Sequence, residues 1–389
     1  MIDFIALQTH TKQLITKLLE SQGGDSLKTP RLIVALSGGA DSVFLLHLLA
    51  QVATTMPLTL IVAHLNHGWR GAADNADEQF CRNLAQQFNC TFITAHADAI
   101  ATTKVWNGSQ EELGRHQRHT FLQNTAKQFN ACGIAFGHHA QDQEETFFIR
   151  LLRGASLEGL CGMSPISFEL QRITTPQDKN GSRIGVRDDK EVEPETSNFP
   201  QTHPIEISVI PDHDPGSRAS SPIIRPLLHT SRTDIEQWLT TNNQPWCHDS
   251  DNTNPRFLRN RIRHELLPVL HAIDTRFEHN FARTVHQLQQ EQELIDQLVN
   301  NTFAIIFDNN GQGNLDQFKK LHPMLQGHVL KKLLISNKMP FNLSEGFIDE
   351  ALRFLNSPRG GTHQLNQSWS LTKKSSSFFL TSHNNKGSL

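Results

Sequence analysis

Hydrophobic and polar positions follow two alternating patterns along the first part of the chain. Short, nearly continuous apolar runs are separated by longer stretches in which apolar residues recur at helical spacing. Runs of the first kind predict buried parallel strands, and stretches of the second kind predict helices that cover them. The predicted strands are 31–36, 58–63, 91–95, 133–137 and 223–228, and the predicted helices are 4–20, 42–53, 74–89, 109–130 and 141–153. This order predicts an α/β fold with a parallel sheet and helices on both faces.

The remainder of the chain has a different pattern. Residues 171–221 are rich in Pro, Ser and Asn and have little periodicity, which predicts an irregular surface insertion. Helical spacing then dominates at 232–241, 255–306, 315–337 and 344–355, and a β-like stretch at 363–381 is typical of a hairpin. We therefore expect three regions: an α/β catalytic domain over 1–230 that contains the insertion, a mainly helical domain over 231–356, and a short β-like tail over 357–389.

Composition narrows the class of protein. The formal charge of −3 shows no global basic field, so any RNA-binding surface must be a local patch. The five cysteines form no C-x-x-C pair, which predicts reduced thiols and argues against a disulfide framework, a zinc knuckle or an iron–sulfur site. No apolar run is long enough to span a membrane and no secretory signal is apparent, so we expect a cytoplasmic protein that does not bind membranes.

A glycine-containing loop separates the first predicted strand from the helix that follows it. Its residues are Ser37, Gly38, Gly39, Ala40, Asp41 and Ser42. The glycines allow the backbone to approach phosphate oxygens, and the helix N-terminus supplies unpaired N–H donors. Asp41 would repel a polyphosphate unless it binds a bridging cation, for which we expect Mg²⁺. The loop therefore predicts an ATP site, and the alternative is a glycine turn with a capping side chain.

The S-G-G-x-D-S motif in this position resembles the PP-loop (N-type ATP pyrophosphatase) superfamily, whose members have a Rossmann-like fold and cleave ATP between the α- and β-phosphates. Further segments narrow the resemblance: HLNHGWR at 64–70, HHAQDQEET at 138–146, RPLL at 225–228 and RNRIR at 259–263. Over about 30–170 and 222–275 the chain resembles the tRNA(Ile)-lysidine synthase family.

This resemblance implies a reaction and its partners. ATP would adenylate the C2 carbonyl oxygen of cytidine 34 in an isoleucine tRNA with a CAU anticodon, releasing pyrophosphate. The ε-amine of free L-lysine would then attack C2 and expel AMP, giving lysidine, which pairs with A instead of G. Codon reading would change from AUG to AUA, and tRNA identity from methionine to isoleucine.

The residue types suit this chemistry, and three residues are predicted to be catalytic: Asp41, Asp142 and Arg115. Charge developing on the α-phosphate needs fixed cations, for which Arg115, Arg150 and Arg153 are candidates. A cationic substrate needs carboxylates that bind it or accept its proton. The predicted lysine site consists of His138, Asp142, Glu145 and Arg153, with His138 as a neutral hydrogen-bonding partner. The alternative is that the acids only stabilise a helix N-terminus.

A basic segment near residue 260 predicts contacts with tRNA phosphates. The predicted tRNA-binding residues are Arg225, Arg259, Asn260, Arg261 and Arg263. A solvated charge run is the alternative for the last four. Position 141, often Asp in the family, is Gln here, which places more weight on Asp142. Longer members carry a further domain that reads the acceptor stem, and only a short stretch follows the last predicted helix here.

Two other functions stay open at this point. Another PP-loop tRNA modifier, a tRNA thiolase, would relay sulfur through paired cysteines. A non-catalytic nucleotide- or RNA-binding module would have no need for acids and arginines directed at one crevice. The sequence leaves the oligomeric state open, with a homodimer among the alternatives.

Overall fold

The computed structural model describes residues 2–23, 29–100, 110–168, 220–247, 258–337, 339 and 344–383. All of the predicted insertion except Ser220 and Ser221 lies outside the described residues, as does the stretch 248–257. Contacts divide the chain into two compact units. The first comprises Met1–Arg153 and Gly162–Glu278, and the second comprises Gly154–Cys161 and His279–Leu389.

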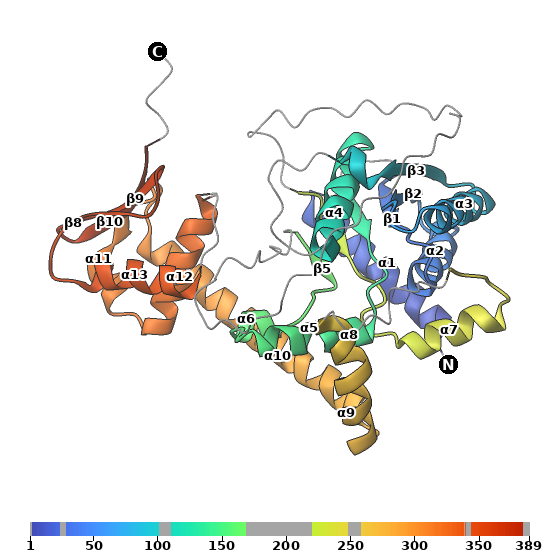
Figure 1. Cartoon of the computed structure of the whole chain (residues 1–389). Helices are drawn as coiled ribbons and strands as arrows, with labels where there is room; N and C mark the ends of the chain where they lie inside the picture. Colours follow the sequence, from blue (N-terminus) through green and yellow to red (C-terminus); the bar gives the residue numbers. More distant parts are fainter. Residues whose placement is uncertain are drawn as a thin grey trace, which may run out of the picture. The chain divides into compact units, whose positions relative to one another are not determined.

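The first unit contains a six-stranded sheet in the order β3-β2-β1-β4-β6-β5 (Figure 1). Its strands are β1 (Arg31–Ala35), β2 (Thr59–Asn66), β3 (Thr91–His96), β4 (Gly133–Ala135), β5 (Ile166–Ser167) and β6 (Ile223–Ile224). All neighbouring pairs are parallel except β5 and β6. The predicted parallel sheet is thus confirmed. Since the carboxyl ends of parallel strands share one edge, the segments that follow β1, β2, β4 and β6 are brought together there.

Helices cover both faces of this sheet. They are α1 (Phe4–Ser21), α2 (Ala40–Ala53), α3 (Ala72–Gln87), α4 (Gln110–Gln128) and α7 (Arg232–Thr241), with a short turn η1 (Ala97–Ala99). A further helix, α5 (Ala140–Leu152), follows β4. Leu32 and Val34 of β1 pack with α1, α2, α3 and α7, whereas Ile33 packs with α4. Successive strand residues point to opposite faces, so a continuous apolar run is needed to fill both cores. No helix within the described ranges is both long and apolar enough to cross a bilayer.

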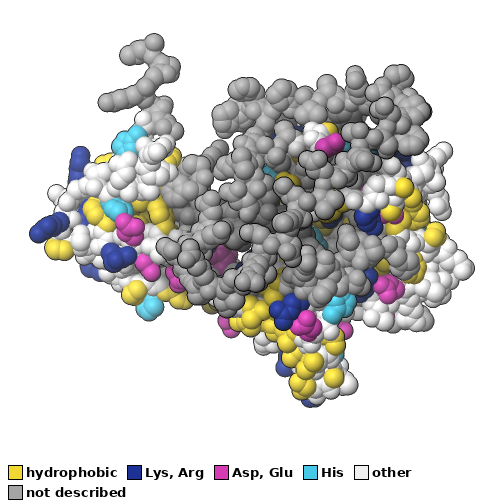
Figure 2. Space-filling view, viewed as in Figure 1, with side chains coloured by type: hydrophobic (Ala, Val, Ile, Leu, Met, Phe, Trp, Pro, Cys, Tyr) yellow, Lys and Arg dark blue, Asp and Glu magenta, His cyan; other side chains and the backbone are white. Residues whose placement is uncertain are grey.

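The helical pattern predicted over 255–306 is confirmed for its described part, which is divided into several helical pieces. It contains α8 (Leu258–Arg261), a π-helical turn η3 (Ile262–Leu266), α9 (Leu267–Ile273) and α10 (Phe277–Ile306). Asp274 leaves the helical conformation and its Oδ1 accepts the Arg276 N–H at 2.9 Å. Val269 and Ile273 are 54% and 77% exposed, and hydrophobic side chains gather over α9 in Figure 2.

The second unit is helical with a small antiparallel sheet. Its elements are α6 (Leu157–Leu160), most of α10, β7 (Gly313–Asn314), α11 (Leu315–Lys319), α12 (Pro323–Ser336), α13 (Glu345–Asn356), β8 (Gly361–Gln364), β9 (Trp369–Lys374) and β10 (Ser377–Ser382). The predicted hairpin is present as β8, β9 and β10. Leu371 and Phe378 share one core with Phe318 and with α12 and α13. The β-strands therefore belong to this unit, and 232–278 groups with the first unit, whereas the sequence predicted a boundary at 230/231.

Lys373 of β9 is a buried cation in the second unit, only 3% exposed. Its Nζ donates to the carbonyl oxygens of Phe354 at 2.8 Å and Ser357 at 2.7 Å, and to Ser357 Oγ at 2.9 Å. These oxygens lie at the carboxyl end of α13, where backbone carbonyls have no partner within the helix and the dipole attracts a cation. Burial lowers the pKa of the ammonium group. Lys373 thus joins the sheet to the end of α13.

Candidate active site

The loop between β1 and α2 has the geometry of an anion site. Gly38 has φ +94°, a conformation that favours glycine, and Gly39 caps α2 with extended backbone. Ser42 Oγ donates to the Gly39 carbonyl at 2.9 Å and accepts the Ser37 N–H at 3.2 Å. These bonds close the loop around the N-terminus of a 14-residue helix, whose first N–H groups are directed at the loop.

The thiols of Cys81 and Cys247 pack against this loop near Gly38. A Cβ added at Gly38 would lie 3.2 Å from Cys247 Sγ and 3.4 Å from Cys81 Sγ. The Cys247 N–H also donates to the Gly38 carbonyl at 2.9 Å. Burial raises the pKa of both thiols, so both are neutral. They support the loop as packed side chains, and there is no space for a side chain at position 38.

Asp41 lies in the first turn of α2. Its Oδ1 is buried without a hydrogen-bond partner among the described residues, and its Oδ2 is 3.6 Å from His139 Nε2. Burial raises the pKa of Asp41, and this effect outweighs the charges of His139 and Arg232, which lower it. A buried carboxylate oxygen without a donor, beside a phosphate loop, suits a hard divalent cation. No cluster of three or more acid, His or Cys ligands occurs within the described ranges.

The turn after β4 brings a second acidic group to this edge of the sheet. A Cβ added at Gly137 would lie 2.9 Å from the Asp41 carbonyl oxygen, so this turn packs closely on α2. His139, only 2% exposed, caps α5, and its N–H donates to Asp142 Oδ2 at 3.1 Å. Burial would raise the pKa of Asp142, but His139, Arg259 and His138 outweigh it, and the pKa lies well below its ordinary value.

The basic segment at α8 and η3 contacts the acids of α5. Arg259 donates to Asp142 Oδ1 at 3.0 Å and to Glu145 Oε2 at 2.5 Å, and Arg263 donates to Glu145 Oε1 at 2.5 Å. Glu145 is fully buried between the two guanidinium groups. The other two predicted tRNA contacts in this segment differ from these: Asn260 is buried, and the exposed Arg261 pairs with Glu265 at 3.1 Å.

The remaining predicted cations occupy three different places. Arg115 of α4 is exposed, and its charge contributes to the lowered pKa of His138 and of Arg225. Arg225 is 3% exposed and hydrogen-bonds to His138. Arg153 is exposed at the carboxyl end of α5. It lies about 16 Å along the helix axis from Asp142 at 1.5 Å per residue, so the structure does not bring these two predicted lysine-site residues together.

One cation of this edge was missed by the sequence analysis. Arg232 begins α7, its N–H donates to Gln141 Oε1 at 2.9 Å, and its Nε pairs with Glu236 at 2.9 Å. Burial would lower the pKa of Arg232, but Glu236 and the charges of Asp41 and Asp142 raise it above its ordinary value. The sequence signal was its position directly after the strand-like run 223–228. Arg232 therefore adds a positive charge that acts on both acids.

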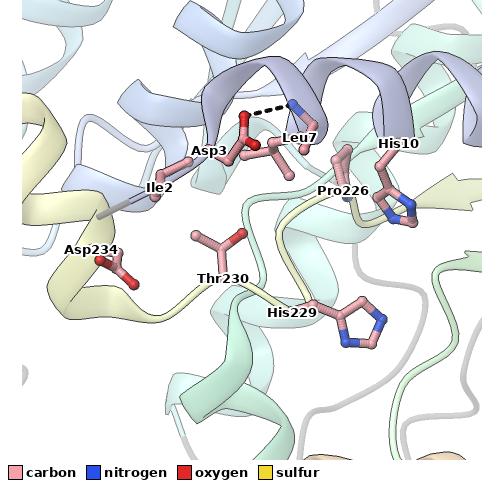
Figure 3. Close-up of a pocket in the computed structure, with 9 residues that line it drawn as sticks. Ile2, Asp3, Leu7, His10, Pro226, His229, Thr230 and Asp234 are labelled. Atoms are coloured by element: carbon pink, nitrogen blue, oxygen red, sulfur yellow. Dashed lines mark hydrogen bonds between the residues drawn. The ribbon is translucent and has the colours of Figure 1, made fainter.

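A cavity of about 340 Å³ lies near this edge of the sheet, and none of the candidate site residues described above lines it (Figure 3). Its lining comes from the N-terminal end of α1 and the segment that leads into α7, including His10, His229 and Thr230. The Thr230 carbonyl accepts the Ala140 N–H at 3.0 Å, which fixes the first turn of α5. This cavity does not include the phosphate loop.

Comparisons with known proteins place the chain in a family. A family model described as a PP-loop domain matches residues 7–181 and 204–270. The chain is 32% identical over 269 residues to the tRNA(Ile)-lysidine synthase of Geobacter sulfurreducens, covering 69% of this chain and 46% of that protein. It is 25% identical over 356 residues to the enzyme of the same name from Petrotoga mobilis, covering 91% and 93%.

A solved structure aligns with part of the chain at low identity. The tRNA thiolase NcsA from Methanococcus maripaludis aligns with a TM-score of 0.45 at 14% identity, over 72% of this chain and 79% of that chain. The chain spans about half the length of several curated relatives, such as the 46% for the Geobacter protein. The family model covers more than half of the chain, including the phosphate loop and the acids of α5. The chain belongs to the PP-loop domain family.

Proposed function

We propose that the protein is a tRNA(Ile)-lysidine synthetase, which uses ATP to join free L-lysine to C2 of cytidine 34 in a CAU-anticodon isoleucine tRNA. The observation that carries the proposal is the meeting of a phosphate loop, the carboxylates Asp41, Asp142 and Glu145, and the guanidinium groups of Arg259 and Arg263. Curated relatives with this activity in their names support it.

In the first step, the loop 37–42 holds the β- and γ-phosphates as the leaving pyrophosphate. The cytidine O2 forms a bond to the α-phosphorus as the bond to the β-phosphate oxygen breaks. The orphaned Oδ1 of Asp41 would hold Mg²⁺, which neutralises phosphate charge when bound. Positive charge near the α-phosphate would come from Arg115 and Arg232.

In the second step, the ε-amine of lysine forms a bond to C2, and AMP leaves with the former O2. Asp142 and Glu145 would bind the amine as an ammonium ion and take up its proton. Both acids are already paired with Arg259, so the lysine ammonium must compete with that guanidinium. The anionic phosphates of ATP would attract Arg259 away from Asp142, which couples nucleotide binding to the lysine site.

The proposed tRNA contacts are Arg261 and neighbouring residues of the α8–η3 segment, and the predicted location remains the cytoplasm. The rival function, sulfur transfer, would require a reactive thiolate. Cys81 and Cys247 do meet at Gly38, but burial raises the pKa of both, which disfavours thiolate at neutral pH. Lysine transfer is therefore the better supported reaction.

The test is to incubate the protein with ATP, radiolabelled lysine and a CAU-anticodon isoleucine tRNA transcript. We expect label in the RNA together with equimolar AMP, and no label in a transcript with another base at position 34. Asp41→Ala should abolish pyrophosphate release, whereas Asp98→Ala, a matched change of an exposed acid, should not. ATP turnover without lysine in the RNA would refute cytidine 34 as the acceptor of lysine. Only the ATP-splitting activity would then be supported.

A further inference from the structure

We propose that Arg225 is a positioning residue that keeps His138 neutral with its ring proton on Nε2. His138 would then be a hydrogen-bond donor to a substrate oxygen and not the base that deprotonates lysine. The assignment of the substrate rests on the proposed function, whereas the state of the imidazole does not. The sequence alone had suggested that Arg225 contacts tRNA.

The sheet brings the two residues together. Strands β4 and β6 are parallel, with Ala135 opposite Ile224, so the segments that follow them run side by side. The Phe136 N–H donates to the Ile224 carbonyl at 3.0 Å, which extends this pairing by one residue. Arg225 follows Ile224 directly, and His138 lies two residues after Phe136. Their contact is therefore fixed by strand register.

The side chain of Arg225 is too buried to contact a nucleic acid. It is 3% exposed, and its guanidinium donates to the Ser164 carbonyl at 2.9 Å, to Ser167 Oγ at 3.1 Å and to His138 Nδ1 at 3.3 Å. The first two bonds hold β5 against the sheet edge. The third is directed at the ring of a predicted site residue.

The chemistry of the donor determines the state of the ring. A guanidinium has no acceptor and does not lose its proton, so His138 Nδ1 must present its lone pair. The neutral ring then carries its proton on Nε2. Burial lowers the pKa of His138 to about 3, and the charges of Arg225, Arg115 and Arg259 act in the same direction, opposed by Asp142. An imidazole in this state can donate from Nε2 but cannot take up a proton there.

This assignment has a mechanistic consequence. Since His138 has no free lone pair for the lysine proton, another group must accept that proton, and Asp142 and Glu145 are the acids on the adjoining helix. Arg225 acts at one remove, through the orientation and tautomer of the imidazole. It is a positioning residue, because its guanidinium fixes the imidazole of His138, which would contact the substrate.

The direct test is NMR of the protein labelled with ¹⁵N-histidine, with His138 assigned by comparison with His138→Gln. We expect the wild-type His138 signals to show protonated Nε2 and unprotonated Nδ1, unchanged between pH 5.5 and 8. Arg225→Met should mix the two tautomers, and Arg225→Lys, which keeps one donor, should restore the wild-type pattern in part. Arg82→Met, a change at an exposed ion pair on α3, is the control and should leave the signals unchanged.

A kinetic test distinguishes positioning from simple support of the fold. Arg225→Met should lower kcat for lysine ligation by about 100-fold with KM for ATP within about twofold, since a misplaced group affects the transition state most. A wild-type ring that carries its proton on Nδ1, or titrates near its ordinary value, would overturn the proposal even if no variant folds. The expected NMR pattern without lysine ligation would confirm the ring state and refute only the proposed function.

Discussion

Glu144 and Glu145 are adjacent on α5, yet their surroundings are opposite. Glu144 is 1% exposed, and neither of its carboxyl oxygens has a hydrogen-bond partner among the described residues. The Nε2 atom of His271 lies 3.5 Å from Glu144 Oε2. Burial raises the pKa of Glu144 to about 7, and the charges of Glu278 and Glu145 add to the effect. The first unit therefore contains a carboxyl group that resists ionisation.

The sign of the effect on stability follows from proton linkage. The folded state holds a proton on Glu144 that the unfolded chain releases near pH 4.5, so stability falls as pH rises from about 4.5 to about 7 and is constant above. At ~1.36 kcal/mol for each pH unit, this interval corresponds to about 3 kcal/mol of lost stability at alkaline pH. Glu144→Gln removes the titration, so the variant should gain stability relative to the wild type as pH rises.

The measurement is urea unfolding of both proteins at pH 5 and pH 8.5. We expect the free energy of unfolding of Glu144→Gln, relative to wild type, to grow by about 2–3 kcal/mol between these conditions. Glu145→Gln is the matched control, because that carboxylate is fully buried between Arg259 and Arg263. Removing one partner of a buried ion pair costs about 3–5 kcal/mol, so this neighbour should be destabilised. An equal effect of Glu144→Gln at both pH values would refute the reasoning.

Three further variants test the site and the fold. Gly38→Ala should weaken ATP binding by about tenfold in calorimetry, because a side chain at φ +94° is strained and would meet Cys247 Sγ at 3.2 Å. Gly39→Ala, with 3.7 Å to the nearest side-chain atom and negative φ, should have a smaller effect. Arg259→Lys should lower lysine ligation at least about tenfold and reduce stability in urea unfolding, because an ammonium cannot bridge the Asp142 and Glu145 carboxylates as a planar guanidinium does. Lys373→Met should destabilise the second unit by about 2 kcal/mol in urea unfolding, since buried carbonyls lose their donor.

The sequence predicted the sheet and the phosphate loop well because both have local signals. Apolar runs of strand length between helical stretches specify parallel strands, and glycines before Asp41 specify a loop that approaches phosphate. These features need no knowledge of distant residues. The alternation on β1, with Leu32 and Ile33 facing different helices, then follows from the strand period.

The parts that the sequence did not reveal depend on tertiary contacts. The sequence placed Asp142 and Arg153 in one predicted lysine site, but about three helical turns separate them along the axis of α5. The basic segment was expected to contact RNA, whereas Arg259 contacts carboxylates more than 110 positions earlier in the chain. A charge run shows which charges are present but not which of them are paired within the fold.

Lys373 has a practical consequence beyond its role at the end of α13. An amine-reactive reagent labels lysines whose Nζ is accessible and unprotonated. Lys373 is only 3% exposed and its Nζ donates to several oxygens, so this amine meets the reagent only when the second unit opens. Exposed lysines elsewhere in the same digest calibrate the reagent. The labelling rate at Lys373 therefore reports the opening of the second unit in the intact protein, without an added probe.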